Sequence, residues 1–104
     1  MIELYELRQL AAFAEAGTLS EAAEVLHLSQ PALSRNMKKL EEDLGISLFE
    51  RSKNKLELNK NGEYALELAR KLLDDADSFI TRVRDFDRKS RTITLGICAP
   101  APVW

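Results

Sequence analysis

The stretch from Ser20 to Leu44, SEAAEVLHLSQPALSRNMKKLEEDL, constrains this chain more than any other. It predicts two short helices that meet at a tight corner near His27, and the second helix is expected to begin at about Gln30. Ser29 can cap that helix because its hydroxyl accepts a hydrogen bond from a free backbone N–H group. A proline follows in the first helical turn, where no donor is lost. The second helix also carries polar and basic side chains that its packing does not need.

Apolar residues of this second helix recur at spacings of four, three and four, which places them on one face. The expected core residues are Leu33, Met37, Leu40 and Leu44. The opposite face carries Pro31, Ser34, Arg35 and Lys38, with Gln30 and Lys39 on its flanks. Gln pairs with adenine and Arg with guanine, Ser donates to a phosphate or a base edge, and Lys supplies charge. The pattern is typical of a helix-turn-helix that enters the major groove of DNA, and a solvated charged face is the alternative.

The net charge of −2 and the pI of about 5.4 argue mildly against DNA binding, but the distribution of charge matters more. Between residues 29 and 40 the only charged residues are Arg35, Lys38 and Lys39. Between residues 51 and 56 they are Arg51, Lys53 and Lys55. Acidic residues collect elsewhere in the chain. A domain with one positive face is compatible with these positions.

A length of 104 residues suits one small domain with an appendage and is short for an enzyme with a deep cleft. No apolar run approaches the length of a membrane span, and the first residues do not have the layout of a signal peptide. The single cysteine, Cys98, cannot form an intramolecular disulfide, and an inert buried role is the usual one for such a residue. These features predict a cytoplasmic protein that does not contact a membrane.

No catalytic or metal site is predicted. His27 has no cysteine or acidic cluster at ligand spacing, so a role in the turn or in packing is favoured over metal binding. An enzyme could in principle use His27, Ser29 or Ser34, but nothing arranges them as nucleophile, base and orienting group. No glycine-rich phosphate loop is present either. We therefore expect no enzymatic activity and no cofactor.

One further helix is predicted before the corner, from about Glu3 to Ala16, with Gly17 as its C-cap. Its apolar face comprises Leu4, Leu7, Leu10, Ala11, Phe13 and Ala14. Either Thr18 or Ser20 caps the next helix, which is the first of the corner. That helix is expected to bury Ala22, Ala23, Val25 and Leu26.

Gly45 is a stop signal after the second helix of the corner. The apolar segments 46–49 and 56–58 then flank a basic stretch, which predicts a two-stranded hairpin whose tip contains Asn54, a residue that tolerates positive φ. A basic hairpin at this position is the pattern of a DNA-binding wing, with an ordinary surface loop as the alternative.

A long final helix is expected to follow, capped by Asn59 and running to about Arg88. Apolar residues alternate at spacings of four and three, which is a heptad pattern and favours pairing of helices. They are Ala65, Ala69, Leu72, Ala76, Phe79, Val83 and Phe86. A homodimer is predicted, because the helix is longer than a small domain can cover; the alternative is that it folds back on its own domain. Residues 92–97 alternate like a strand.

These residues resemble the N-terminal DNA-binding part of LysR-type transcriptional regulators. The runs SQPALSR at residues 29–35 and LFER at residues 48–51 carry the resemblance most specifically. Further matches are Leu7–Leu10, Phe13, Glu15–Gly17, Ser20, Ala22, Ala23, Leu26, His27, Leu40, Glu41, Leu44, Gly45, Leu58 and Gly62. The resemblance covers essentially the whole chain. Asn36, Asn59 and the tip Lys53–Lys55 depart from the residues that are common in the family.

The resemblance implies a mainly α protein in which a winged helix-turn-helix of three helices and a two-stranded wing spans residues 1–58. A linker helix that pairs two subunits would span residues 59–90, and residues 91–104 would begin an effector-binding domain that binds a small molecule. By position, Gln30, Pro31, Ser34, Arg35 and Lys38 would meet the major groove. Ser29 would meet a phosphate, and Arg51, Lys53 and Lys55 the adjacent backbone or minor groove.

Family members bind double-stranded promoter DNA as dimers or tetramers, so the resemblance implies an inverted-repeat operator. An interaction module is the competing hypothesis. In that case the chain would use its heptad seam to pair with a longer relative and would not bind DNA alone.

Overall fold

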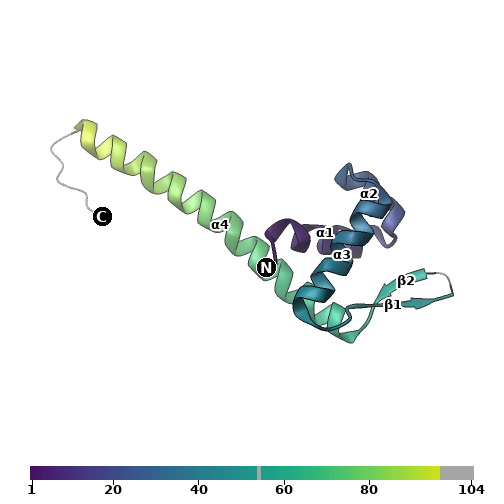
Figure 1. Cartoon of the computed structure of the whole chain (residues 1–104). Helices are drawn as coiled ribbons and strands as arrows, with labels where there is room; N and C mark the ends of the chain where they lie inside the picture. Colours follow the sequence, from purple (N-terminus) through teal and green to yellow (C-terminus); the bar gives the residue numbers. More distant parts are fainter. Residues whose placement is uncertain (54, 97–104) are drawn as a thin grey trace. The chain divides into compact units, whose positions relative to one another are not determined.

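The computed structural model describes residues 1–53 and 55–96, with side chains as far as Arg91. Its elements are α1 (Leu4–Ala16), α2 (Leu19–Leu26), α3 (Gln30–Leu44), β1 (Phe49–Ser52), β2 (Lys55–Leu58) and α4 (Lys60–Gly96) (Figure 1). The first compact unit ends at Leu73, and the rest of α4 belongs to a second unit. The strands β1 and β2 pair antiparallel as one hairpin. The predicted fold class, a winged helix-turn-helix followed by a long helix, is confirmed.

The helix ends follow the capping residues of the sequence. The Thr18 Oγ1 accepts a hydrogen bond from the Glu21 N–H at 3.1 Å, which decides between the two caps that the sequence allowed for α2. Gly17 ends α1 with a φ of 89°, in the left-handed region that glycine adopts without strain. Asn59 caps α4, because its Oδ1 accepts a hydrogen bond from the Gly62 N–H at 2.8 Å. The predicted caps at Gly17 and Asn59 are confirmed.

A single hydrophobic core lies between the helices and the base of the hairpin. Its buried residues are Leu7, Leu10, Phe13, Ala22, Ala23, Leu33, Met37, Leu40, Leu48 and Ala69. Phe13 of α1 meets Phe49 of β1 edge to face, with ring centroids 5.4 Å apart, so the core continues into the wing. Leu4, Val25 and Leu44 were expected in this core but are exposed, Val25 by 69%. Val25 lies on a different side of α2 from Ala22, Ala23 and Leu26, which face the core, and Leu4 and Leu44 lie in the terminal turns of their helices.

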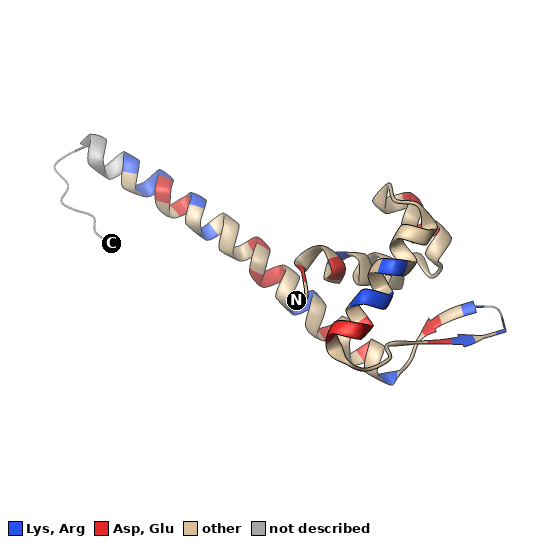
Figure 2. Ribbon diagram, in the orientation of Figure 1, with Lys and Arg blue, Asp and Glu red and all other residues tan. Residues whose placement is uncertain are grey.

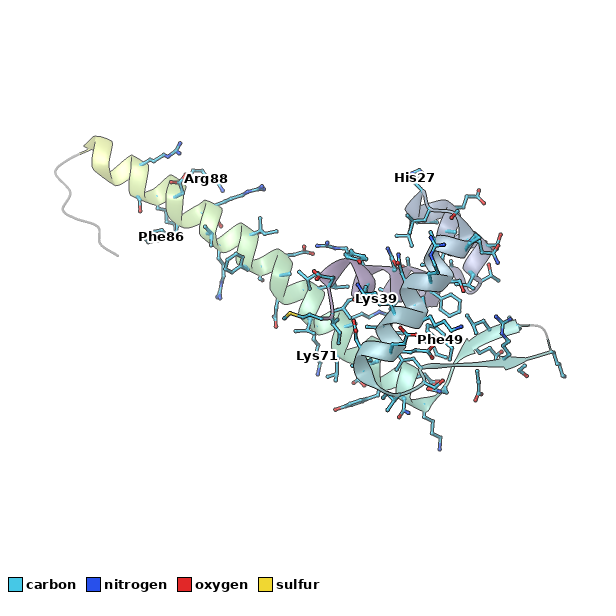
Figure 3. All side chains as sticks on the ribbon, viewed as in Figure 1. His27, Lys39, Phe49, Lys71, Phe86 and Arg88 are labelled. Carbon is cyan, nitrogen blue, oxygen red and sulfur yellow. The ribbon has the colours of Figure 1, made fainter. Side chains whose placement is uncertain are left out.

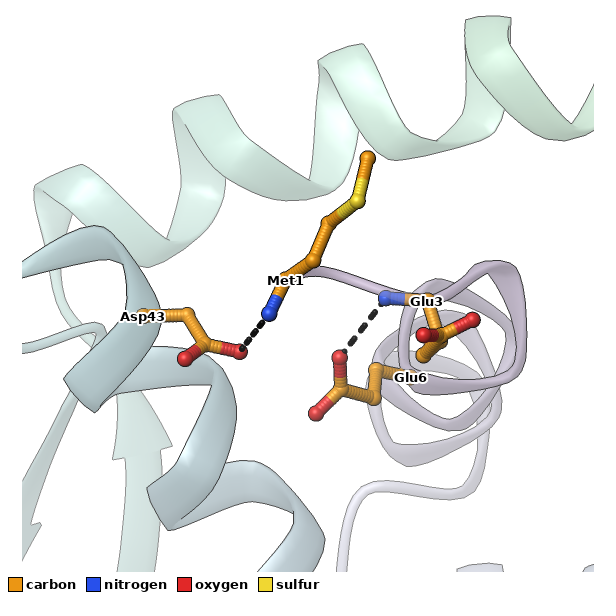
Figure 4. Close-up of polar contacts among 4 residues, drawn as sticks. All are labelled: Met1, Glu3, Glu6 and Asp43. Atoms are coloured by element: carbon orange, nitrogen blue, oxygen red, sulfur yellow. Dashed lines mark hydrogen bonds and ion pairs between the residues drawn. The ribbon is translucent and has the colours of Figure 1, made fainter.

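Two polar residues of α1, Glu6 and Gln9, are buried, which the apolar pattern did not predict. Glu6 completes a capping box at the start of α1, where its Oε1 accepts a hydrogen bond from the Glu3 N–H at 2.8 Å (Figure 4). The Met1 ammonium group lies nearby, 3.9 Å from the Asp43 carboxylate of α3. The N-terminal turn of α1 is therefore held by polar contacts as well as by the core.

The described part of α4 extends beyond the predicted end at Arg88 and runs helically to Gly96. The strand predicted for residues 92–97 is thus wrong over residues 92–96, and Ile97 lies outside the described residues. A helix forms its hydrogen bonds within its own segment, whereas an isolated strand has no ladder to join. The residues of the tail from Ile97 onward, including Cys98, also lie outside the described residues. No helix in the described part of the chain is long and apolar enough to cross a membrane.

Candidate nucleic-acid interface

The corner between α2 and α3 sets the direction of α3. His27 ends α2 in the left-handed conformation, with a φ of 59°, and its N–H donates to the Glu24 carbonyl oxygen at 3.2 Å. The Leu28 N–H closes the turn by donating to the Ala23 carbonyl oxygen at 2.9 Å. The turn role predicted for His27 is therefore confirmed (Figure 3).

The first turn of α3 is held as the sequence predicted. The Ser29 Oγ accepts a hydrogen bond from the Ala32 N–H at 3.2 Å, and Pro31 occupies the first turn. Leu33, Met37 and the next apolar residue, Leu40, are buried against α1 and α2. Because these three fix the rotation of the helix, the opposite face of α3 is turned to solvent.

That solvent face carries the predicted DNA-contacting residues of α3. All of them are exposed: Ser29, Gln30, Pro31, Ser34, Arg35 and Lys38. Lys39 is exposed on the flank (Figure 3). Figure 2 shows lysine and arginine along the middle of α3, whereas acidic residues appear towards its C-terminal end. The face combines donors and acceptors suited to base edges with positive charge suited to phosphates.

The wing brings Arg51 next to α3. Arg51 lines a shallow hollow together with Ser34 and Lys38 of α3. It also lines a second hollow with Gln30, with Lys55 of β2 and with residues 17–20 at the start of α2. Basic groups of the wing therefore border the same surface as the N-terminal half of α3.

The tip of the wing follows the last residue pair of the hairpin. Ser52 pairs with Lys55 as the last residue pair of the hairpin. Lys53 is exposed and has a φ of 51°, which is the left-handed conformation that tight hairpin turns require. Asn54, which the sequence placed at the tip as a residue that tolerates positive φ, lies outside the described residues.

The wing is also less uniformly basic than its sequence implied. Glu50 of β1 pairs directly with Glu57 of β2, so two exposed carboxylates share one face of the hairpin. Like charges directly opposite one another destabilise a strand pair. Periodicity alone could not reveal this pair, because it depends on the register of the hairpin.

The base of the wing is tied to α3 and α4. One carboxylate oxygen of Glu41 in α3, Oε2, accepts hydrogen bonds from the Leu48 N–H at 2.7 Å and the Phe49 N–H at 3.2 Å. At the other end of the hairpin, the Asn59 N–H donates to the Leu48 carbonyl oxygen at 2.9 Å. Gly62 packs so tightly that an added Cβ would lie 2.2 Å from that same oxygen. These contacts hold both ends of the hairpin, and no pattern in the sequence had pointed to this role for Glu41.

The predicted dimerisation seam of α4 divides into two sets. Ala69 is 1% exposed and Ala65 is partly buried, and both pack against the core of their own domain. At these two residues α4 packs against its own domain, which was the alternative to pairing with a second copy. Leu72 and Phe79 are 53% and 68% exposed, and Val83 and Phe86 are also exposed, while Ala76 is partly buried.

Most of the exposed apolar residues of α4 lie in one stripe. Leu68, Leu72, Phe79, Val83 and Phe86 fall within about 60° of one another around the helix at 100° per residue. We call these five residues the α4 stripe. It starts at Leu68, which only flanked the predicted seam, and leaves out the two alanines that pack inward.

The fold and the exposed basic face define a winged helix-turn-helix protein. The sequence profile of the family described as "Bacterial regulatory helix-turn-helix protein, lysR family" matches residues 4–63. The chain therefore belongs to the lysR family of bacterial regulatory helix-turn-helix proteins.

Similar proteins agree with this assignment. YbhD of Escherichia coli (strain K12), an uncharacterized HTH-type transcriptional regulator, is 36% identical over 102 residues, which are 98% of this chain and 32% of YbhD. The structure of a CbnR DNA-binding domain complexed with DNA is 42% identical, with a TM-score of 0.78 over 83% of this chain and 99% of that one. A BenM DNA-binding domain complexed with catB site 1 DNA is 32% identical, with a TM-score of 0.80 over 86% and 96%. The chain spans about a third of the length of the curated relatives it matches.

Proposed function

We propose that this chain binds double-stranded DNA sequence-specifically, as the DNA-binding part of a LysR-type transcriptional regulator that works in the cytoplasm. The exposed polar and basic face of α3 beside Arg51 carries this proposal. The similarity to the CbnR and BenM domains, which were solved with DNA, supports it. An enzyme is not proposed, because the family match is to regulatory proteins.

In the proposed complex the N-terminal half of α3 enters the major groove. Gln30 and Arg35 read bases, while Ser34 and Lys38 contact base edges or phosphates. Ser29 binds a phosphate at the helix N-terminus. The wing residues Arg51, Lys53 and Lys55 contact the adjacent backbone or minor groove. Pro31 contributes van der Waals contact at the start of the helix.

We further propose that two copies pair through the α4 stripe and read an inverted repeat. The exposure of Leu72, Phe79 and Val83 supports this pairing, because contiguous exposed apolar surface marks interaction sites. Residues 1–58 would bind DNA, residues 59–90 would pair the subunits, and residues 91–104 would lead to an effector-binding domain. A small-molecule effector and a tetrameric assembly would belong to that larger protein.

The first test is to select duplexes from a random pool at increasing salt concentration and to sequence the retained fraction. Enrichment of an inverted repeat supports a dimeric, sequence-specific protein. Binding that is steeply salt-dependent but unenriched would reduce the proposal to non-specific DNA binding. Absence of binding, together with tight association with a longer lysR-family protein, would favour the interaction module.

Replacing Arg35 by alanine is expected to weaken binding to the selected operator by about 1–3 kcal/mol and to relax the preference at one base pair. The reason is the loss of a side chain that can form two hydrogen bonds to guanine. Lys39→Ala is the matched control, because it removes the same charge from the flank of α3. The control should weaken all duplexes alike, as measured by fluorescence anisotropy. Unchanged affinity and preference in the Arg35 variant would contradict the assignment of α3.

Replacing Glu57 by lysine is expected to strengthen DNA binding several-fold at low salt. The change converts a repulsive pair with Glu50 into an attractive one, worth about 0.2–1 kcal/mol, and adds positive charge to the wing. Glu67→Lys makes the same charge change on exposed α4 surface outside the wing and should alter affinity less. Equal gains in the two variants would show that overall charge, and not the wing, is responsible.

A further inference from the structure

The strongest polar contact between α3 and the wing is made by one residue, Glu41. Its Oε2 receives the Leu48 N–H at 2.7 Å and the Phe49 N–H at 3.2 Å, and the Ser47 hydroxyl lies 3.2 Å away. Hydrogen bonds to an ionised acceptor are about twice as strong as neutral ones. Two consecutive N–H groups at the start of β1 thus point at one carboxylate that is fixed on α3.

Asn59, which follows β2, contacts the same segment that Glu41 contacts before β1. The Asn59 Nδ2 donates to the Ser47 carbonyl oxygen at 3.0 Å, and the Asn59 N–H donates to the Leu48 carbonyl oxygen at 2.9 Å. Segment 47–49 therefore receives contacts from the end of β2 on one side and from Glu41 on the other. Glu41 is therefore the polar link between α3 and this segment, in addition to the apolar packing of Leu48 and Phe49 in the core.

Glu41 also lies where a negative charge is unfavourable for DNA binding. It lines the same hollow as Lys38 of α3 and Arg51 of the wing, the groups that would face phosphates. Simple electrostatics predicts that removal of this charge strengthens DNA binding. The carboxylate of Glu41 repels DNA phosphates, so its presence favours binding only if its hydrogen bonds to the wing contribute more than this repulsion costs.

We propose that Glu41 is a positioning residue that sets the wing relative to α3, so that wing and helix contact one DNA site together. This inference rests on the proposed DNA binding. It makes a prediction opposite in sign to electrostatics, because loss of Glu41 weakens binding although it removes a negative charge. It also predicts that the wing lysines contribute to affinity only while Glu41 holds the hairpin.

The test compares Glu41→Ala and Glu41→Gln with the control Glu42→Ala, which removes the same charge from the neighbouring exposed position. The probe is a fluorescent mixed-sequence duplex of about three helical turns, long enough for two half-sites one turn apart. Each protein is measured with and without the double change Lys53→Ala and Lys55→Ala. Affinities are taken at several salt concentrations.

We expect Glu41→Ala to weaken binding by about tenfold and Glu42→Ala to leave it unchanged or tighter. Removing the two wing lysines should flatten the salt dependence by up to about two in slope in the parent chain, and hardly at all in the Glu41→Ala background. Glu41→Gln keeps an acceptor oxygen and should restore most of the wing contribution. Equal effects of the lysine changes in both backgrounds, or tighter binding by Glu41→Ala, would overturn the inference.

Amide hydrogen exchange without DNA separates this inference from the DNA-binding proposal. Glu41→Ala should accelerate exchange in residues 49–58 by at least about tenfold relative to Glu42→Ala, while the buried turns of α1 and α3 keep their protection. Unchanged exchange in the wing would overturn the positioning role even if DNA binding is normal. Faster exchange of the wing in Glu41→Ala, combined with a parent chain that binds no duplex, would uphold the positioning role of Glu41 and reject DNA binding.

Discussion

Replacing Gly62 by alanine is expected to lower the free energy of unfolding by about 2–3 kcal/mol. In an exposed helix the same change stabilises by up to about 1 kcal/mol. Here the new Cβ would lie 2.2 Å from the Leu48 carbonyl oxygen and 2.9 Å from the Leu58 Cδ2. The nearest atom is backbone and belongs to a fully buried residue, so the first turn of α4 must move away from the wing base. Overpacking of this kind typically costs about 1–3 kcal/mol.

Urea denaturation followed by circular dichroism measures this loss. Gly45→Ala is an informative control, because Gly45 has a φ of 75° and an added methyl group there would meet nothing within 4 Å, so only backbone strain opposes the change. That strain is worth about 1–2 kcal/mol. Asn61→Ala, at the exposed neighbouring position, should be neutral or slightly stabilising. A Gly62→Ala chain as stable as the parent would show that α4 does not pack against Leu48 as described.

Replacing Phe79 by aspartate is expected to weaken the proposed dimer by at least about a hundredfold. Burial of one phenylalanine contributes about 1.5–3 kcal/mol, and a symmetric dimer loses two of them. The carboxylates would also be desolvated without partners. Phe79 is the most exposed residue of the α4 stripe in the single chain, so its loss should hardly alter the stability of the domain itself.

Analytical ultracentrifugation over a range of concentrations measures this dissociation. Thr81→Asp adds the same charge about 160° away around α4 and should leave the dimer intact. Operator affinity should fall with the dimer, because the second half-site is then no longer bound at a high effective concentration. Similar dissociation constants for the Phe79 and Thr81 variants would reject the α4 stripe as the pairing surface.

The sequence was sufficient wherever the determining interaction is local. Ser29, Gly17 and Asn59 were assigned as caps because a cap depends on residues within one turn of it. The exposed face of α3 followed from its spacing, since Leu33, Met37 and their partner faces fix its rotation. For the same reason the class of fold could be predicted from the order and spacing of the residues alone.

Features that depend on contacts between distant segments were missed. Glu41 and Gly62 both contact Leu48 at the base of the wing, which is distant from each of them in sequence. The Glu50–Glu57 pair depends on the register of the two strands. The heptad pattern of α4 combined an inward face with an outward one, because periodicity does not distinguish the protein's own core from a partner. Ala69 was therefore assigned to the seam, although it is buried in the core of its own domain. The strand predicted at residues 92–96 was wrong, because an alternating pattern of apolar and polar residues does not show whether a neighbouring strand is present to pair with.

The contact at the start of α4 also bears on the chemical ageing of the protein. Residues 61 and 62 are an Asn–Gly pair, the dipeptide most prone to deamidation, because glycine does not hinder attack of its own nitrogen on the preceding side-chain amide. In the folded chain the Gly62 N–H is instead donated to the Asn59 Oδ1 at 2.8 Å. Ring closure must therefore wait until this turn opens. The rate at which aspartate and isoaspartate form at residue 61 is thus expected to follow how often the first turn of α4 opens.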